Sequence, residues 1–253
     1  MSAYMRLMRL LKQDYSAEEI HQILRSYTDE KNETDKQIHY DVKQPIGTIW
    51  KYTNCAKYDI NGAHAYFLTK MFPKSEKRLL EFYNKKDEYK KLGMSAKDKE
   101  IKETFNLSVG MIKHKGYEGA YWWIVHQTTR TLRAAINETF GDDSMLIYAN
   151  TDGFCISNPA RELPTSSTLG EFKLEMRGDY FVYSGENNRL YQYISSKGEV
   201  EKVGTTLMEL RPDFDLFTGN IVEYKREYIE CGEGGVYVAK NKKKKKLKVE
   251  EVI

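Results

Sequence analysis

The strongest constraint on the fold is a long amphipathic segment that leads directly into two short apolar runs. Residues 121–140 carry apolar side chains at helical spacing, and the Gly-Asp-Asp of residues 141–143 interrupts the pattern. The runs 145–148 and 154–156 flank a polar turn, as the strands of a β-hairpin do. A helix with one apolar face beside such a hairpin predicts a sheet backed by a helix.

The rest of the sequence predicts helices and strands around this unit. Two short helices are expected near the N-terminus, and a capping box of Ser16 and Glu19 opens the second. The other expected elements are a strand over 56–60, helices over 75–91 and 95–109 with Gly93 between them, and strands over 169–175, 180–183 and 190–194. This order indicates an α+β fold, with an antiparallel sheet backed by helices and a projecting helical hairpin.

Composition excludes several classes of protein. Hydrophobic residues make up 40% of the chain and charged residues 30%, which is typical of a soluble globular protein. Cys55, Cys155 and Cys231 lie far apart without zinc-site spacing, and no apolar run is long enough to cross a membrane. We therefore expect a cytoplasmic protein without a membrane partner. The net charge is only +3, so a nucleic-acid surface requires an uneven distribution of charge.

Two aspartates stand at places where a sheet could bring them together. Asp59 lies near the end of one predicted strand, and Asp152 lies in the turn of the hairpin. On neighbouring strands the two carboxylates would repel each other, and divalent cations would remove this penalty. Two metal ions about 3.5–4 Å apart can activate a hydroxyl and neutralise a leaving pyrophosphate. Taken singly, each aspartate could also be an ordinary turn or strand-end residue.

A second group of residues suits a nucleotide. Lys102 and Asn106 are four residues apart, which places them on one face of the predicted helix. A lysine and an amide presented together suit a triphosphate, while Gly110 permits close approach of a base pair or backbone. The alternative is a solvated lysine on an ordinary helix.

These segments, in this order, resemble the motifs of the family B DNA polymerases, in particular the phage branch with protein-primed enzymes. Residues 58–66, Tyr-Asp-Ile-Asn-Gly-Ala-His-Ala-Tyr, are similar to motif A, and Lys102, Asn106 and Gly110 match motif B. Residues 148–153, Tyr-Ala-Asn-Thr-Asp-Gly, match motif C in part. Residues 188–191 resemble the family's K-x-Y element, and residues 234–238 resemble its thumb segment.

The resemblance implies a role for each matching residue. Asp59, Asp152 and the backbone of Ile60 would hold two Mg²⁺ or Mn²⁺ ions, and Lys102 would bind the triphosphate. The other residues expected to contact the nucleotide are Asn61, Gly62, Ala63, His64, Asn106 and Gly110. Those expected to contact primer or template are Thr151, Arg189, Tyr191, Lys242, Lys243 and Lys244. The run of lysines at residues 242–246 could instead be a solvated tail. The lysines of the helical hairpin, such as Lys86, could guide nucleotide or template.

The resemblance also implies a domain organisation. An N-terminal helical extension and linker (1–45) would precede a palm (46–74 and 113–207), fingers (75–112) and a thumb with a basic tail (208–253). The expected activity is template-directed addition of dNTPs to the 3′-hydroxyl of a primer on primer–template DNA. Too few residues precede motif A for the family's exonuclease domain, so proofreading is expected from a separate chain or other replication proteins. A phage or mobile-element origin, with action in the bacterial cytoplasm, is implied.

The chain departs from the family pattern at four positions. Asn150 stands in place of the first aspartate of motif C, and His64 replaces the tyrosine that blocks a ribose 2′-hydroxyl. Leu107 and Val109 replace a serine and a tyrosine of motif B. Two alternatives therefore remain: a catalytically impaired, DNA-binding or replisome accessory protein, and another palm enzyme such as a reverse transcriptase or a primer-making transferase.

Overall fold

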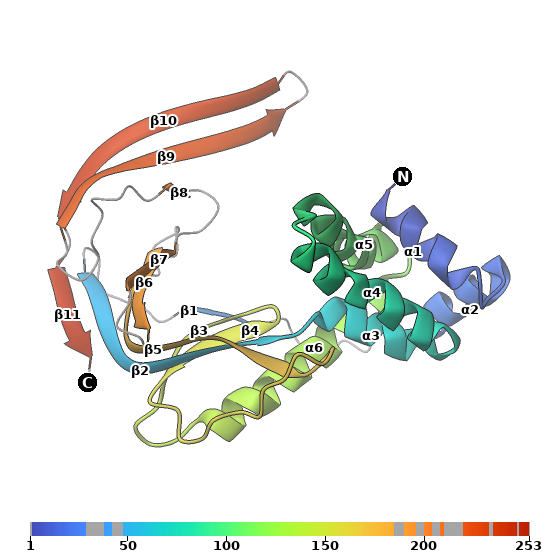
Figure 1. The fold of residues 1–253 in the computed structure, drawn as a ribbon, viewed down its shortest axis with the longest axis horizontal. Coiled ribbons are helices and arrows are strands. Elements are labelled where there is room, and N and C mark those ends of the chain that lie inside the picture. The colour runs from blue at the N-terminus through green and yellow to red at the C-terminus, as the bar shows by residue number, and fades with distance from the viewer. Residues whose placement is uncertain are drawn as a thin grey trace.

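The computed structural model describes residues 2–28, 38–41, 48–184, 190–195, 200–203, 208–209, 220–232, 235–246 and 248–252. The α-helices within these ranges are α1 (Ala3–Leu11), α2 (Ala17–Ser26), α3 (Ala63–Met71), α4 (Glu76–Lys91), α5 (Ser95–His114) and α6 (Glu118–Thr139). No helix in this described part is both long and apolar enough to cross a bilayer. The helices α1 to α5 cluster at one end of a curved sheet, while α6 extends along the sheet (Figure 1).

The main sheet has the strand order β1-β3-β4-β2-β5-β6-β7. Its strands are β1 (His39–Asp41), β2 (Thr48–Ile60), β3 (Met145–Asn150), β4 (Gly153–Ser157), β5 (Phe172–Ser184), β6 (Leu190–Ser195) and β7 (Val200–Val203). All these neighbours are antiparallel, as predicted, whereas β11 (Lys248–Val252) pairs parallel with the start of β2. A second sheet contains β8 (Met208–Glu209), β9 (Asn220–Gly232) and β10 (Gly235–Lys246), and its long hairpin arches over the main sheet (Figure 1).

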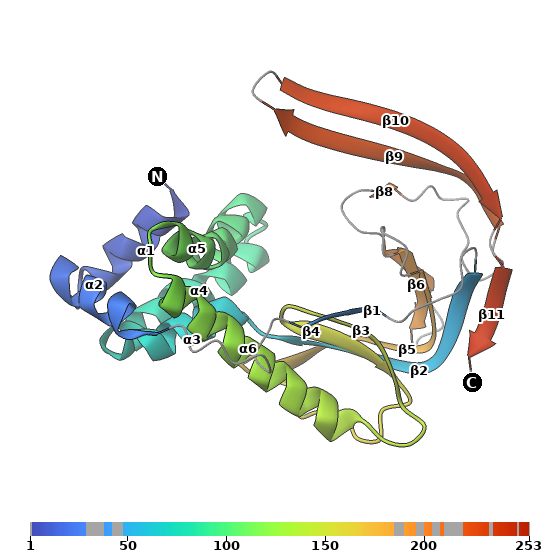
Figure 2. The same ribbon diagram turned by 180° about the vertical axis from the view of Figure 1, so that it is seen from behind.

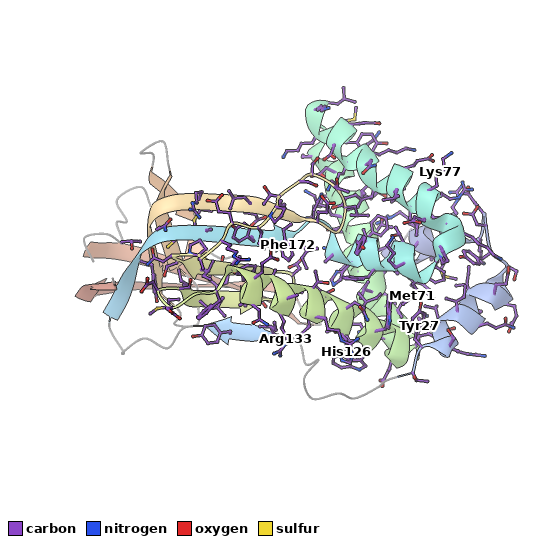
Figure 3. The ribbon with its side chains drawn as sticks, turned by 90° about the horizontal axis from the view of Figure 1, so that it is seen from below. Tyr27, Met71, Lys77, His126, Arg133 and Phe172 are labelled. Atoms are coloured by element: carbon purple, nitrogen blue, oxygen red, sulfur yellow. The ribbon has the colours of Figure 1, made fainter. Side chains whose placement is uncertain are left out.

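Helix α6 covers one face of the main sheet (Figure 3). Leu132 and Ala135 of α6 pack in one buried cluster with apolar residues of β2, β3 and β4, among them Tyr58 and Phe154. Because side chains alternate along a strand, the neighbours of Tyr58 on β2 point to the face that α6 does not cover. One of those neighbours is Asp59, so this packing directs the candidate acid away from the core.

The helical part has its own core, which joins α1 and α2 to α3, α4, α5 and α6. Ser16 and Glu19 form the predicted capping box of α2. Helices α4 and α5 form the predicted hairpin, and Gly93, with a φ of 69°, makes the turn between them. The Arg78 guanidinium of α4 binds the Asp14 carboxylate at 2.9 Å, which anchors the N-terminal helices to this hairpin.

Several elements differ from the sequence prediction. Helix α3 was not predicted, because six of its nine residues are buried and the segment lacks a polar face. The two strands predicted over 169–175 and 180–183 form the single strand β5, which continues through Gly178. Strand β2 begins eight residues earlier than predicted, and α5 continues to His114 rather than ending at Val109.

Candidate active site

Asp59 and Asp152 lie on neighbouring strands, at the end of β2 and in the turn between β3 and β4. Asp59 is paired in register with Gly153, the residue that follows Asp152. The Ile60 N–H donates a hydrogen bond to the Asp152 carbonyl oxygen at 2.8 Å. Thr151 adopts a φ of 50°, which is rare for a β-branched residue and marks a strained turn. Backbone pairing therefore holds two acids that are remote in sequence beside each other.

A glycine at position 153 permits this close approach. A Cβ there would lie 2.9 Å from Asp59 Oδ1 and 2.9 Å from the Tyr58 carbonyl oxygen. Both distances are shorter than real Cβ contacts, so any side chain at Gly153 would displace Asp59 or the strand.

Burial raises the pKa of both carboxyl groups. The pKa of Asp59 rises to about 6, first because burial disfavours the charged form and second because the Asp152 carboxylate lies nearby. The pKa of Asp152 is also raised, with burial as the main cause. The Lys173 ammonium, 2.8 Å from Asp59 Oδ2, partly offsets these effects. The pair is thus a site of buried negative charge that favours cations.

A chain of ion pairs along β5 completes the surroundings of Asp59. Lys173 Nζ also lies 3.0 Å from Glu175 Oε1, and Lys57 Nζ lies 2.7 Å from Glu175 Oε2. The β2–β5 register shifts between Lys57 and Tyr58, which leaves Glu175 as an extra residue in a bulge. Sequence reasoning missed Lys57, Lys173 and Glu175. Their only signal was the alternation of charged residues along a strand, which an exposed sheet face also shows.

The turn after Asp59 is fixed by hydrogen bonds. The Asn61 side-chain amide donates to the carbonyl oxygens of Ser167 and Thr168, and the Asn61 N–H donates to the Glu171 carbonyl oxygen. Gly62 has a φ of 60°, and a Cβ there would lie 2.3 Å from the Tyr83 hydroxyl oxygen. The polar groups of Asn61 are thus used within the protein. They hold the turn that presents Ile60 to Ala63 beside the acids.

Four predicted nucleotide and template residues line one cavity of about 210 Å³. These residues are His64, Asn106, Gly110 and Thr151, from three separate segments of the chain. The cavity is completed by Val109, Tyr121, Val125 and Thr128. We call it the nucleotide cavity. His64 Nδ1 lies 3.2 Å from Asn106 Oδ1, and burial lowers the pKa of His64, so a neutral imidazole faces the cavity.

Lys173 contacts Asp59, and Lys86 lies near both Lys173 and Lys102. Lys102 of α5 binds Asp98 of the same helix at 2.9 Å. Lys86 of α4 lies 3.8 Å from the centre of the Tyr83 ring. Burial lowers the pKa of Lys86, and the positive charges of Lys102 and Lys173 add to this effect. The Lys86 ammonium is therefore close enough to those of Lys102 and Lys173 to be repelled by them, which favours an anion beside Lys86.

The two carboxylates fit a magnesium ion that takes some of its ligands from the protein and the others from a substrate and water. Within the residues that the structure describes, no group of three or more His, Cys, Asp or Glu side chains converges as a metal site. Mg²⁺ commonly binds through one or two carboxylates and completes its coordination with waters and substrate phosphates. Asp59 and Asp152 supply two such carboxylates, and a bound cation would favour their ionised forms against the effect of burial.

The remaining predicted residues belong to β3, β6 and β10 or lie outside the described part. Asn150 ends β3, and its side-chain oxygen accepts a hydrogen bond from the Thr151 hydroxyl at 3.2 Å. Arg189 lies outside the described residues, as do residues 29–37 and 42–47 of the predicted N-terminal extension and palm. Tyr191 lies on β6, opposite Tyr183. Lys242, Lys243 and Lys244 lie on β10. Their contacts with primer or template stay predictions.

Comparison with known proteins gives a distant structural similarity and no sequence match. No protein-family model matches the chain, and no curated protein matches it. Among solved structures, the chain is similar to the family B DNA polymerase from the hyperthermophilic archaeon Pyrobaculum calidifontis, with a TM-score of 0.39 and 14% sequence identity. The similarity covers 72% of this chain and 31% of that chain.

Proposed function

We propose that the chain is a template-directed DNA polymerase that adds dNTPs to the 3′-hydroxyl of a primer. The observation that carries the proposal is the position of the two remote acids, Asp59 and Asp152, beside each other on β2 and the β3–β4 turn. The nucleotide cavity, which gathers His64, Asn106 and Gly110, supports it independently.

Asp59 and Asp152 are the residues that would hold two Mg²⁺ or Mn²⁺ ions, together with the Ile60 carbonyl oxygen. Bound there, the ions would lower the pKa of the primer hydroxyl and neutralise charge on the phosphates. The partly buried carboxylates would fix the position of the reacting groups. Glu175 and Lys173 hold the Asp59 side chain in place through their ion pairs.

The reaction is an in-line displacement. The primer 3′-oxygen forms a bond to the α-phosphorus, the bond between the α- and β-phosphates breaks, and pyrophosphate leaves while the hydroxyl proton passes to solvent. Lys102 exchanges its contact with Asp98 for the triphosphate, and Lys86 adds a second positive charge. His64 and Asn106 position the sugar, and Gly110 leaves room for the nascent base pair.

Primer extension tests the proposal directly. A labelled primer on a DNA template is incubated with one dNTP at a time and Mg²⁺ or Mn²⁺. We expect the wild-type protein to add only the nucleotide that the template specifies, and Asp152→Asn to add none. The Asp142→Asn variant, which alters an aspartate in the turn before β3, is the matched control and should extend as wild type does.

The outcomes also separate the alternatives. DNA binding without any extension would favour an accessory protein. Extension on RNA templates, or with rNTPs in place of dNTPs, would favour another palm enzyme. Extension that persists in Asp152→Asn would contradict the assignment of the acid pair.

A further inference from the structure

A groove on the helical part of the molecule is separate from the nucleotide cavity. It has a volume of about 790 Å³ and is formed by α1, α2 and the turn between α5 and α6. Figure 2 shows α1 beside α5 and this turn. The residues used below are Tyr4, Met8, Arg9, Lys12, Lys115 and Tyr117, and we call the site the N-terminal groove. Its volume lies in the range of sites that bind nucleotide-sized ligands.

The N-terminal groove is positively charged. Arg9, Lys12 and Lys115 are exposed, and none of the described lining residues is acidic. Two acids of the N-terminal region are paired elsewhere, since Asp14 binds Arg78 and Glu19 binds Lys74 at 3.0 Å. Within the described residues, no ion pair involves any of the three cations of the groove. Their charge is therefore available to an anionic partner.

The same groove offers flat and polarizable side chains. Tyr117 is buried and forms a hydrogen bond with His21, whereas Tyr4 is partly exposed beside it and presents its ring to the groove. Met8 adds a thioether, which adapts to aromatic rings of varied shape. Unpaired bases stack on such surfaces, whereas a duplex hides the faces of its bases. Cations beside aromatic rings thus indicate a single strand rather than a duplex.

A strip of similar side chains connects the groove to the nucleotide cavity. Lys115 and Tyr117 line the groove, and Lys113 lies in the last turn of α5, just before them in sequence. Lys113 Nζ is 5.1 Å from the ring centre of Tyr121 and 5.1 Å from that of Trp122. Tyr121 lines the nucleotide cavity. A strand could therefore follow lysines and aromatic rings from one site to the other.

We infer that the N-terminal groove binds the single-stranded 5′ extension of the template strand before it reaches the nucleotide cavity. This inference rests on the proposed function, because it assigns a path to the template of the same reaction. Arg9, Lys12 and Lys115 contact phosphates, while Tyr4 and Met8 contact bases. The helices α1 and α2 thereby gain a role as a template guide.

Fluorescence anisotropy tests this inference without any catalytic step. Binding is measured for a primer–template with a ten-nucleotide 5′ overhang and for the same duplex with blunt ends. In the Arg9→Ala/Lys12→Ala/Lys115→Ala variant, we expect affinity for the overhang substrate to fall about tenfold or more. Affinity for the blunt duplex should stay within about twofold of wild type. For the overhang substrate, the slope of log affinity against log salt concentration should become shallower by about two.

The matched control removes three exposed cations from other elements, as Lys77→Ala/Arg133→Ala/Arg161→Ala. Figure 3 shows Lys77 on α4 and Arg133 on α6. The control should bind both substrates as wild type does. Equal losses on the overhang and blunt substrates, or no loss on either, would overturn the inference, as would equal losses in the control.

A cross-linking measurement keeps the test independent of variant folding. A 4-thiothymidine placed in the overhang should cross-link wild-type protein within residues 4–12 or 113–122, and cross-links confined to other segments would overturn the inference. The two proposals fail separately. Overhang-dependent binding without primer extension contradicts the polymerase alone, while extension without overhang-dependent binding contradicts the groove alone.

Discussion

The ammonium group of Lys173 lies 2.8 Å from Asp59 Oδ2 and also 3.0 Å from Glu175 Oε1. One positive charge of the protein thus bridges two carboxylates at the candidate site. Any divalent ion that binds Asp59 meets this charge as a neighbour and has to compete with it. The Lys173 side chain therefore stabilises the metal-free protein and weakens metal binding at the same time.

Replacing this lysine should separate the two effects. We expect Lys173→Met to bind Mn²⁺ about tenfold more tightly, because removal of one adjacent positive charge is worth on the order of 1 kcal/mol or more. The same variant should unfold at a lower temperature without metal. Isothermal titration with Mn²⁺ measures the first effect. Lys57→Met, which loses the ion pair with Glu175 but leaves the Lys173–Asp59 contact in place, is the control, and equal tightening in both variants would rule out direct competition.

The raised pKa of Asp59 predicts a pH dependence of stability. Since the folded-state pKa is about 6 and the ordinary value is 3.8, the folded protein binds the proton more tightly than the unfolded chain. The free energy of unfolding should therefore fall by up to about 3 kcal/mol as pH rises from about 4 to about 6, and then level off. The difference between wild type and Asp59→Asn in urea unfolding, measured at each pH without metal, isolates this contribution.

Asp14 provides a comparison of opposite sign. Its hydrogen bonds with Arg78 and Ser75 lower its pKa to about 2, so it stabilises the protein above its ordinary pKa and loses this effect as pH falls. Asp14→Asn should thus be less stable than wild type at neutral pH. If Asp59→Asn were also less stable than wild type at neutral pH, and if this difference did not change as pH falls, burial would not be what raises the pKa of Asp59.

Sequence reasoning located the acids because local patterns fix their elements. The apolar runs around residues 149–153 define a hairpin, and strand alternation places Asp59 beside it. The same reasoning missed Lys173, since its partner Glu175 depends on a bulge whose register appears only in the pairing of β2 with β5. It also missed the contact of Lys102 with Asp98, although the spacing of four residues on α5 was available.

The N-terminal groove shows a second limit of sequence reasoning. Arg9 and Lys12 resemble ordinary exposed residues of a short helix, and nothing in their spacing relates them to Lys115. Only the packing of α1 against α5 brings these cations to one surface. A single sequence therefore does not predict which charged residues from distant segments come together on one surface.

Two glycines near the nucleotide cavity should respond in opposite ways to alanine. A Cβ at Gly110 meets no atom within 4 Å, so Gly110→Ala should stabilise α5 by up to about 1 kcal/mol. If the proposed function holds, it should also lower the rate of nucleotide incorporation, because the added methyl group would enter the cavity assigned to the nascent base pair. Urea unfolding and single-nucleotide incorporation measure the two effects, and unchanged incorporation would remove Gly110 from the site.

Gly62→Ala should instead lower stability by about 2 kcal/mol or more. Its φ of 60° is unfavourable for alanine, and the Cβ would lie 2.7 Å from Leu169 Cδ1 as well as against Tyr83. The measurement is again the urea midpoint. A variant as stable as wild type would contradict the close packing of the turn that follows Asp59.

The central claim is that Asp59 and Asp152 together hold divalent ions for nucleotidyl transfer, and counting bound Mn²⁺ tests it most directly. Electron paramagnetic resonance can count the ions in a complex with a 3′-deoxy-terminated primer, template and the matching dNTP. Wild type should bind two Mn²⁺ ions per chain beyond those in a protein-free mixture, and both Asp59→Asn and Asp152→Asn should bind fewer. Two ions in all three proteins, or none in wild type, would contradict the claim.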